Sequence, residues 1–144
     1  MADQHGRVVV GVDGSPSSRK ALRWALGQAE ATGAKVVAVH AWQVPRNFGT
    51  GAMVMPGAQW DAEARSTLRS AVEPAAAERP QVAVEQHVAE GHPVEVLLEQ
   101  SEDADLLVVG NRGLGGFAGA LLGSVSQHCV RHATCPVVVI HDRA

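Results

Sequence analysis

The sequence has few aromatic residues and no excess of basic ones. Aromatic residues make up 3% of its 144 positions, tyrosine is absent, and 12 lysines and arginines stand against 15 aspartates and glutamates, for a net charge of −3. Nucleic-acid-binding domains usually carry a basic excess, and many single-strand binders stack bases on aromatic side chains. No nucleic-acid partner is therefore expected.

The sequence also lacks a long apolar segment. The stretch between Arg112 and Arg131 is uncharged, but it holds five glycines and several polar residues, so it falls short of the roughly 20 mainly apolar residues that cross a bilayer. Residues 1–7 are polar and carry no apolar signal-peptide core. We therefore expect no membrane contact and a cytoplasmic location.

Cysteine is scarce, with Cys129 and Cys135 alone in the chain. Without an export signal, reduced core thiols are preferred over a disulfide. His128 and His132 stand four residues apart beside them, a spacing that can hold zinc from one helix face. Because Cys135 precedes a proline at the expected start of a strand, it is expected to point away, and the zinc interpretation is the weaker one.

Continuous apolar runs of strand length occur four times, at residues 7–13, 35–41, 105–110 and 136–141. Such runs are typical of parallel strands that are covered on both faces. A fifth run, at 82–89, alternates between apolar and polar residues, as a half-exposed edge strand does.

Helix signals separate these runs. Ser15 is a candidate N-cap, Pro16 suits the first turn and Gly33 marks the end of the first helix. Further helices are expected from near residue 59 to Pro80, at 94–101 and at 123–132. The alternation predicts one α/β domain over residues 1–144, a doubly wound five-stranded parallel sheet of order 3-2-1-4-5 with helices on both faces. Residues 43–57 are predicted to be a flexible loop, with a flap over the ligand site as the alternative.

The last apolar run shows no alternation. In the predicted order it is an edge strand, and an uncharged apolar edge needs cover. We therefore predict that it pairs with the same strand of a second subunit. The predicted interface consists of Val137, Val138, Val139 and Ile140.

A ligand site is expected beyond the carboxyl ends of the first and fourth strands, where the strand order reverses. Asp13 follows the first strand, and a glycine-rich segment from Gly110 to Gly116 follows the fourth. Glycines let a backbone approach a ligand closely, and the free N–H groups of a helix start bind phosphate. Ser124 and Ser126 add hydroxyl groups at such a start, so the segment predicts a phosphate site.

Two common phosphate motifs do not fit this segment. A Walker loop requires a lysine, and no lysine follows Lys35. Gly113, Gly115 and Ala118 match a loose dinucleotide fingerprint, but that fingerprint belongs after the first strand rather than the fourth. A dinucleotide-binding enzyme is therefore disfavoured.

The spacing that does fit is Gly110-x2-Gly113-x9-Gly123-Ser124. Together with residues 11–15 and 131–137, it resembles the ATP-binding branch of the universal stress protein family. The resemblance covers residues 8–140 and implies an adenine nucleotide alpha hydrolase-like fold. Asn111 stands where a small hydroxyl residue is common in the family.

The resemblance implies that ATP, with Mg²⁺, lies in the predicted crevice. Asp13 would contact the ribose or a metal on the phosphates, and the main chain of Ala41 would read adenine. The implied nucleotide-binding residues are Gly11, Val12, Asp13, Ala41, Gly110, Arg112, Gly113, Gly123, Ser124, Val125 and Ser126. The family also dimerises through its last strand. AMP or a cyclic nucleotide remains open as the ligand.

The preferred function is that of a small ATP-binding regulatory protein of the stress response, acting as a homodimeric nucleotide sensor. A slow ATPase is the first alternative, although no general base or catalytic lysine is evident. A nucleotide-independent dimeric scaffold is the second. Asp13 could instead belong only to a turn and helix cap, and Ser124 could be only the N-cap of the last helix.

Overall fold

The computed structural model describes residues 6–43, 57–112 and 123–141. The strands are β1 (Arg7–Gly11), β2 (Lys35–Trp42), β3 (Val84–Glu90), β4 (Leu106–Gly110) and β5 (Val137–Ile140), and the helices are α1 (Pro16–Thr32), α2 (Gly57–Ala77), α3 (Pro93–Gln100) and α4 (Ser124–His132). None of the helices in these ranges is long and apolar enough to cross a membrane.

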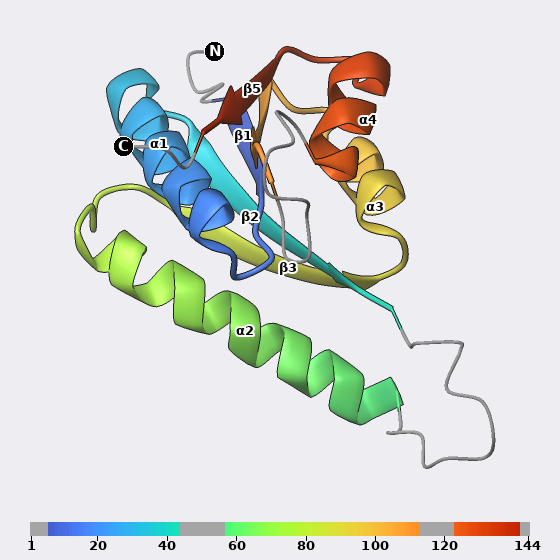
Figure 1. Ribbon diagram of the computed structural model, residues 1–144. Coiled ribbons are helices and arrows are strands. Elements are labelled where there is room, and N and C mark those ends of the chain that lie inside the picture. The colour runs from blue at the N-terminus through green and yellow to red at the C-terminus, as the bar shows by residue number, and fades with distance from the viewer. Residues whose placement is uncertain (1–5, 44–56, 113–122, 142–144) are drawn as a thin grey trace, which may run out of the picture.

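The five strands form one parallel sheet of order β3-β2-β1-β4-β5 (Figure 1). Val8 of β1 stands beside Val36 of β2 on one side and beside Leu106 of β4 on the other. The predicted fold class and strand order are thus confirmed.

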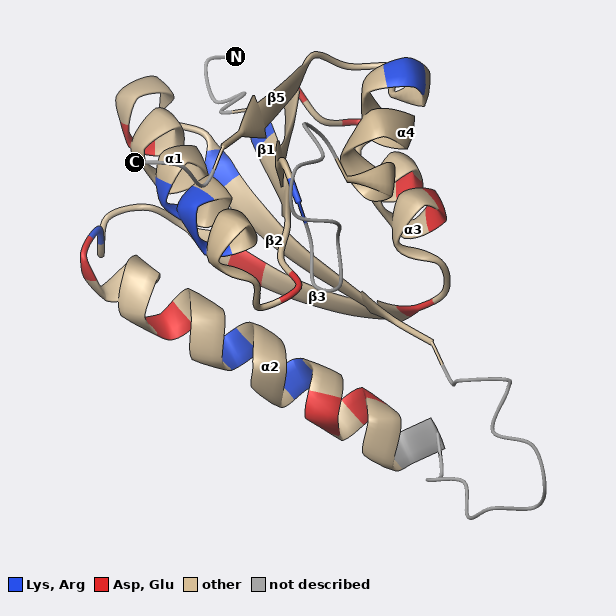
Figure 2. Ribbon diagram, in the orientation of Figure 1, with Lys and Arg blue, Asp and Glu red and all other residues tan. Residues whose placement is uncertain are grey.

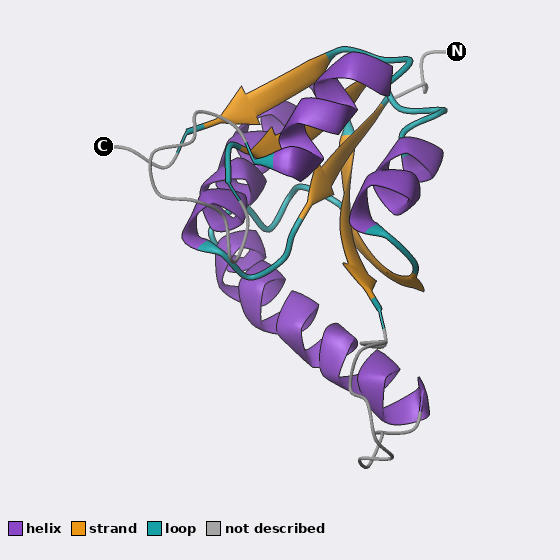
Figure 3. Ribbon diagram, turned by 45° about the vertical axis from the view of Figure 1, so that its right-hand side comes forward, coloured by secondary structure: helices purple, strands orange, loops and turns teal. Residues whose placement is uncertain are grey.

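Helices cover both faces of the sheet, with α1 and α2 on one face and α3 and α4 on the other (Figures 1 and 3). Side chains of β1 alternate between two apolar clusters, as the pleat of a strand requires. Val8 and Val10 pack with Leu22 of α1 on the first face, whereas Val9 packs with Leu97 of α3 on the second. The central strand is therefore buried on both sides.

Some boundaries differ from the predicted ones. β3 begins at Val84 rather than at 82, because the N–H of Val82 donates to the carbonyl of Arg79 in a turn (3.0 Å). α2 begins at Gly57 and ends at Ala77, before Pro80, and it contains Pro74. Residues 44–56 of the predicted loop lie outside the described residues.

Candidate functional site

The predicted crevice lies where the connections of two neighbouring strands diverge. β1 and β4 are adjacent in the sheet, but β1 leads to α1 on one face and β4 leads toward α4 on the other (Figure 3). Open parallel sheets bind ligands at this kind of switch point. The segments after β1 and β4 therefore form the candidate site.

The segment after β1 forms a turn that caps α1. Asp13 accepts a hydrogen bond through Oδ1 from the N–H of Ser15 (2.9 Å), and Gly14 has a φ of 88°, which favours glycine. Ser15 then caps α1 by accepting from the N–H of Ser18 (3.2 Å). The predicted cap is confirmed, and Asp13 is half-buried at the switch point.

The end of β2 joins this turn through His40. Its Nδ1 lies 2.8 Å from the carbonyl oxygen of Val12, and the N–H of Val12 donates to the carbonyl of Val39 (2.8 Å). Ala41, the residue expected to read adenine, follows in β2 and is half-buried. The structure thus brings Val12, Asp13 and the end of β2 together, and both main-chain polar groups of Val12 already have neighbours within the protein.

Two glycines of the motif make close contacts inside the protein. A Cβ on Gly110 would lie 2.9 Å from Cβ of Ser17 and 2.8 Å from its carbonyl carbon, and a Cβ on Gly11 would lie 3.0 Å from Cδ1 of Leu97. Close approach of a ligand was the predicted reason for glycine at position 110. The structure supplies a different one, namely close packing of α1 against β4 and of α3 against β1.

The two halves of the glycine motif meet at Asn111, which is 3% exposed. Its carbonyl oxygen accepts from the N–H of Gly123 and from the hydroxyl of Ser126 (3.2 Å). These bonds hold the end of β4 against the start of α4. The intervening residues 113–122, including the predicted Gly113, lie outside the described residues.

The N-terminus of α4 has no side-chain cap. Gly123 is the N-cap residue with φ −73° and ψ 170°, so Ser124 is not the cap, contrary to the alternative prediction. Within the described ranges, no group accepts from the N–H groups of Ser124, Val125 or Ser126. Figure 2 shows no acidic residue on α4, and its basic residues lie in the last turn.

The two serines at this terminus differ in orientation. Ser124 is exposed, whereas Ser126 is 2% exposed and its hydroxyl donates to an internal carbonyl, that of Asn111 or of Gly123 (both 3.2 Å). Arg112, which follows Asn111 in the chain, is half-buried. Among the described residues, this helix start presents to an anion N–H groups that have no acceptor, an outward hydroxyl and a positive helix end.

The model of the universal stress protein family matches residues 5–141. The chain belongs to this family. A universal stress protein of Mycolicibacterium smegmatis is 36% identical over 94% of this chain and 46% of its own length. Another, Rv2005c of Mycobacterium tuberculosis, is 38% identical over 94% of this chain and 45% of its own length. The chain thus spans about half the length of these curated relatives.

Solved universal stress proteins share the fold. One in complex with cAMP superposes with a TM-score of 0.73 at 35% identity and covers 96% of this chain and 98% of its own. A family member from Arabidopsis thaliana with AMP bound has a TM-score of 0.66 at 25% identity and covers 96% of this chain and 93% of its own. Universal stress proteins of this shape therefore include binders of adenine nucleotides.

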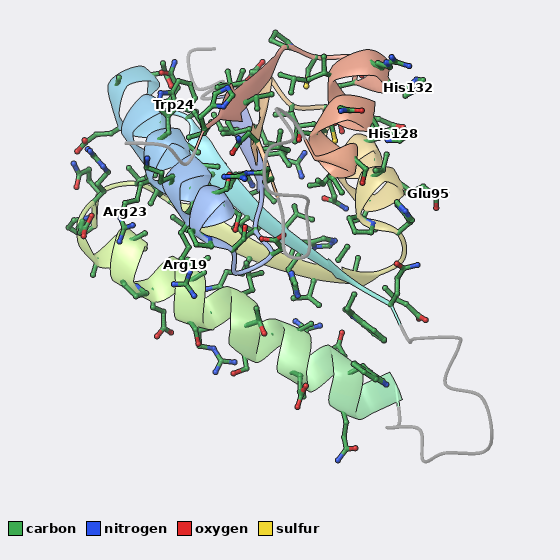
Figure 4. All side chains as sticks on the ribbon, viewed as in Figure 1. Arg19, Arg23, Trp24, Glu95, His128 and His132 are labelled. Atoms are coloured by element: carbon green, nitrogen blue, oxygen red, sulfur yellow. The ribbon has the colours of Figure 1, made fainter. Side chains whose placement is uncertain are left out.

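The histidines and cysteines near the end of this universal stress protein do not converge. His128 and His132 stack with ring centroids 6.2 Å apart and project outward from α4 (Figure 4), whereas Cys129 is 0% exposed in the core. Across the described parts of the chain, no three His, Cys, Asp or Glu side chains are grouped to hold a metal. The four residues therefore do not form the zinc arrangement that their spacing allowed.

Because Cys129 is buried, the stability of the fold should decrease as the pH rises through the alkaline range. Burial, with a smaller contribution from Cys135, raises the pKa of the Cys129 thiol from 9.0 to about 11. The folded state holds its proton longer than the unfolded state, so stability is fully present below pH 9 and falls toward pH 11. We expect a loss of about 2 kcal/mol between about pH 8 and about pH 10.5 in urea unfolding. Cys129→Ala should remove this part of the pH dependence, and an identical profile in that variant would contradict it.

Proposed function

We propose that this universal stress protein binds an adenine nucleotide in the crevice between β1 and β4, with phosphate on the N-terminus of α4, and acts as a nucleotide-responsive regulatory protein. One observation carries the proposal. Gly123 occupies an N-cap position whose φ of −73° any residue adopts; glycine is accepted at N-caps about as well as threonine, but unlike Ser, Thr, Asp and Asn it offers no side-chain acceptor to the N–H groups of the helix. Backbone strain does not explain a glycine at this position, whereas a helix start whose N–H groups have no acceptor among the described residues, and so can bind an anion, does.

The relatives support adenine as the base. The solved relative at 35% identity was crystallised with cAMP, and the Arabidopsis protein holds AMP. Both ligands carry a phosphate close to the ribose, which suits a site in which the turn of Asp13 and the start of α4 lie on neighbouring segments. ATP with Mg²⁺ is the specific ligand that we propose, with Asp13 close to the metal or the ribose.

The proposal is tested by identifying what the protein carries and what it binds. Freshly purified protein is denatured and any released nucleotide is identified by chromatography. The refolded protein is then titrated by calorimetry with ATP, AMP and cAMP, with and without magnesium. We expect binding of ATP in the micromolar range. If the protein binds none of the three nucleotides, the proposal is refuted and a nucleotide-independent scaffold is favoured.

The variant Asp13→Asn distinguishes the proposed role of Asp13 near the metal from its role in the turn. An amide oxygen can still accept from the N–H of Ser15, the bond that Asp13 makes at 2.9 Å, but the negative charge is lost. We expect affinity for ATP with magnesium to fall about tenfold, which corresponds to about 1.4 kcal/mol, and affinity for AMP without magnesium to change little. Equal losses in the two titrations would remove the metal role from Asp13.

We also propose that the protein forms a dimer through the open edge of β5. Its four residues are half-buried. Val138 packs against the apolar cluster on the α1 face of the sheet, and Val139 packs against the cluster on the α3 face. The carbonyl of Pro136 accepts from the N–H of Leu107 in β4 (2.9 Å), and that of Ile140 accepts from the N–H of Asn111, directly after β4 (2.8 Å). Since alternate residues of a strand bond to opposite sides, the main-chain groups of Val139 point to the open edge.

Val139→Pro therefore tests the edge directly. Proline removes one outward N–H without removing a bond to β4, and proline is tolerated in edge strands. We expect a monomer by light scattering at concentrations where the parent protein is a dimer. Val139→Ala loses packing but keeps the N–H and should remain dimeric. A dimeric proline variant would place the interface elsewhere.

A further inference from the structure

We infer that Asn111 is a positioning residue that joins the nucleotide site to β5, so that nucleotide binding and self-association strengthen one another. This inference rests on the proposed function. It concerns three segments that meet at one buried residue, Asn111: the end of β4, the start of α4 and the end of β5.

The main chain of Asn111 binds two of these segments. Its N–H donates to the carbonyl of Ile140, the last residue of β5 (2.8 Å), and its carbonyl accepts from the N–H of Gly123. The hydroxyl of Ser126 donates to the same carbonyl (3.2 Å). A rotation of the backbone at Asn111 would therefore disturb the last bond of β5 and the anchor of α4 together.

The side chain of Asn111 is held by α1. Its Oδ1 accepts from the hydroxyl of Ser17 at 2.9 Å, and Ser17 is 1% exposed. The same hydroxyl lies 3.4 Å from the carbonyl oxygen of Ile140 and 3.5 Å from the main-chain nitrogen of Arg112. Because Gly110 has no Cβ, α1 can approach closely enough for Ser17 to make these contacts.

These contacts supply a physical route between two binding events. Phosphate on the N–H groups of α4 needs the Gly123–Ser126 turn in place, and a second subunit on β5 needs the end of that strand in place. Each event favours the arrangement in which Asn111 is fixed, so the second event meets a network that is already ordered. By linkage, the effect of nucleotide on association equals the effect of association on nucleotide binding.

The experiment measures the dimer dissociation constant by sedimentation velocity, without nucleotide and with saturating AMP. For the unmodified protein we expect AMP to tighten the dimer about fivefold or more, the lower end of typical couplings. Ser17→Ala should reduce this ratio to less than about twofold while AMP still binds. Asn111→Ser, which shortens the side chain but keeps the main-chain bonds, is the second variant and should behave alike.

Ser101→Ala is the matched control. Ser101 is also 1% exposed, and its hydroxyl donates to the carbonyl of Leu98 at the end of α3 (3.1 Å), outside the Asn111 network. This variant should keep the full tightening of the dimer by AMP, because its lost hydrogen bond lies outside the Asn111 network, and it reports any effect that a general loss of stability has on the ratio of dissociation constants.

The outcomes separate the inference from the proposed function. If AMP tightens the dimer as much in Ser17→Ala and Asn111→Ser as in the unmodified protein, the inference is overturned and the proposed function is not. The same holds if the unmodified protein dimerises and binds AMP, but AMP does not tighten the dimer. An equal loss in Ser101→Ala would also overturn it, because the effect would then reflect stability. An unmodified protein that binds none of AMP, ATP and cAMP, or that stays monomeric, would refute the proposed function and the inference with it.

Discussion

Gly123→Asp should stabilise the nucleotide-free protein and weaken nucleotide binding at the same time. Asp is a preferred N-cap residue, and the φ of −73° at this position is open to it. Exchange of Gly for Asp at a cap is worth a few tenths of a kcal/mol, and a negative charge at a helix start adds about 0.3 to 1 kcal/mol. The same carboxylate would occupy the N–H groups of α4 and repel phosphate.

We therefore expect a higher urea midpoint for Gly123→Asp and a loss of affinity for ATP or AMP of at least about tenfold, or 1.4 kcal/mol. Gly123→Asn provides the matched control, since it caps the helix without a charge. It should raise stability by less, because it lacks the contribution of the charge, and it should weaken binding less. If the titration curve of the aspartate variant matches that of the unmodified protein, phosphate does not bind at this helix end.

Among substitutions that add a single methyl group at the site, Gly110→Ala should destabilise the folded protein most. The new Cβ would lie 2.8 Å from the carbonyl carbon of Ser17, a backbone atom that no rotamer change can move. Overpacking of a core usually costs about 1 to 3 kcal/mol, and a backbone clash belongs at the upper end. A loss of about 3 kcal/mol corresponds to a fall of roughly 10 °C in Tm for a domain of this size.

Gly11→Ala is the comparison for this prediction. Its Cβ would meet Cδ1 of Leu97 at 3.0 Å, and the end of a leucine side chain can turn away. We expect a cost below about 1 kcal/mol, measured by urea unfolding of both variants under one condition. If the two alanine variants are equally stable, the packing of α1 against β4 is not what requires glycine at position 110.

The fold could be predicted from the sequence because its signals are local. Apolar runs such as that of β1 mark buried parallel strands, and the cap at Ser15 is formed by neighbours in the chain. Errors arose where tertiary contacts set a boundary. The start of β3 depends on the turn that binds Val82 to Arg79, and the alternating pattern continues through that turn without a break.

The site was predictable as a set of segments but not as a set of contacts. The glycine motif led to the end of β4 and the start of α4, which the structure brings together. The bond between Ser17 and Asn111 joins residues 94 positions apart, and no pattern in the sequence links them. For the same reason, a glycine at position 110 suggested a ligand, since the sequence does not reveal which atoms approach it.

The strand order also has a consequence for synthesis on the ribosome. β1 lies between β2 and β4, so its first edge can pair as soon as β2 has emerged, whereas its second edge waits for Leu106–Gly110. During that interval an apolar edge containing Val8, Val9 and Val10 has no strand to cover it, and exposed edges of this kind favour aggregation of nascent chains. Slow translation between β3 and β4 would prolong this exposure, and fast translation would shorten it.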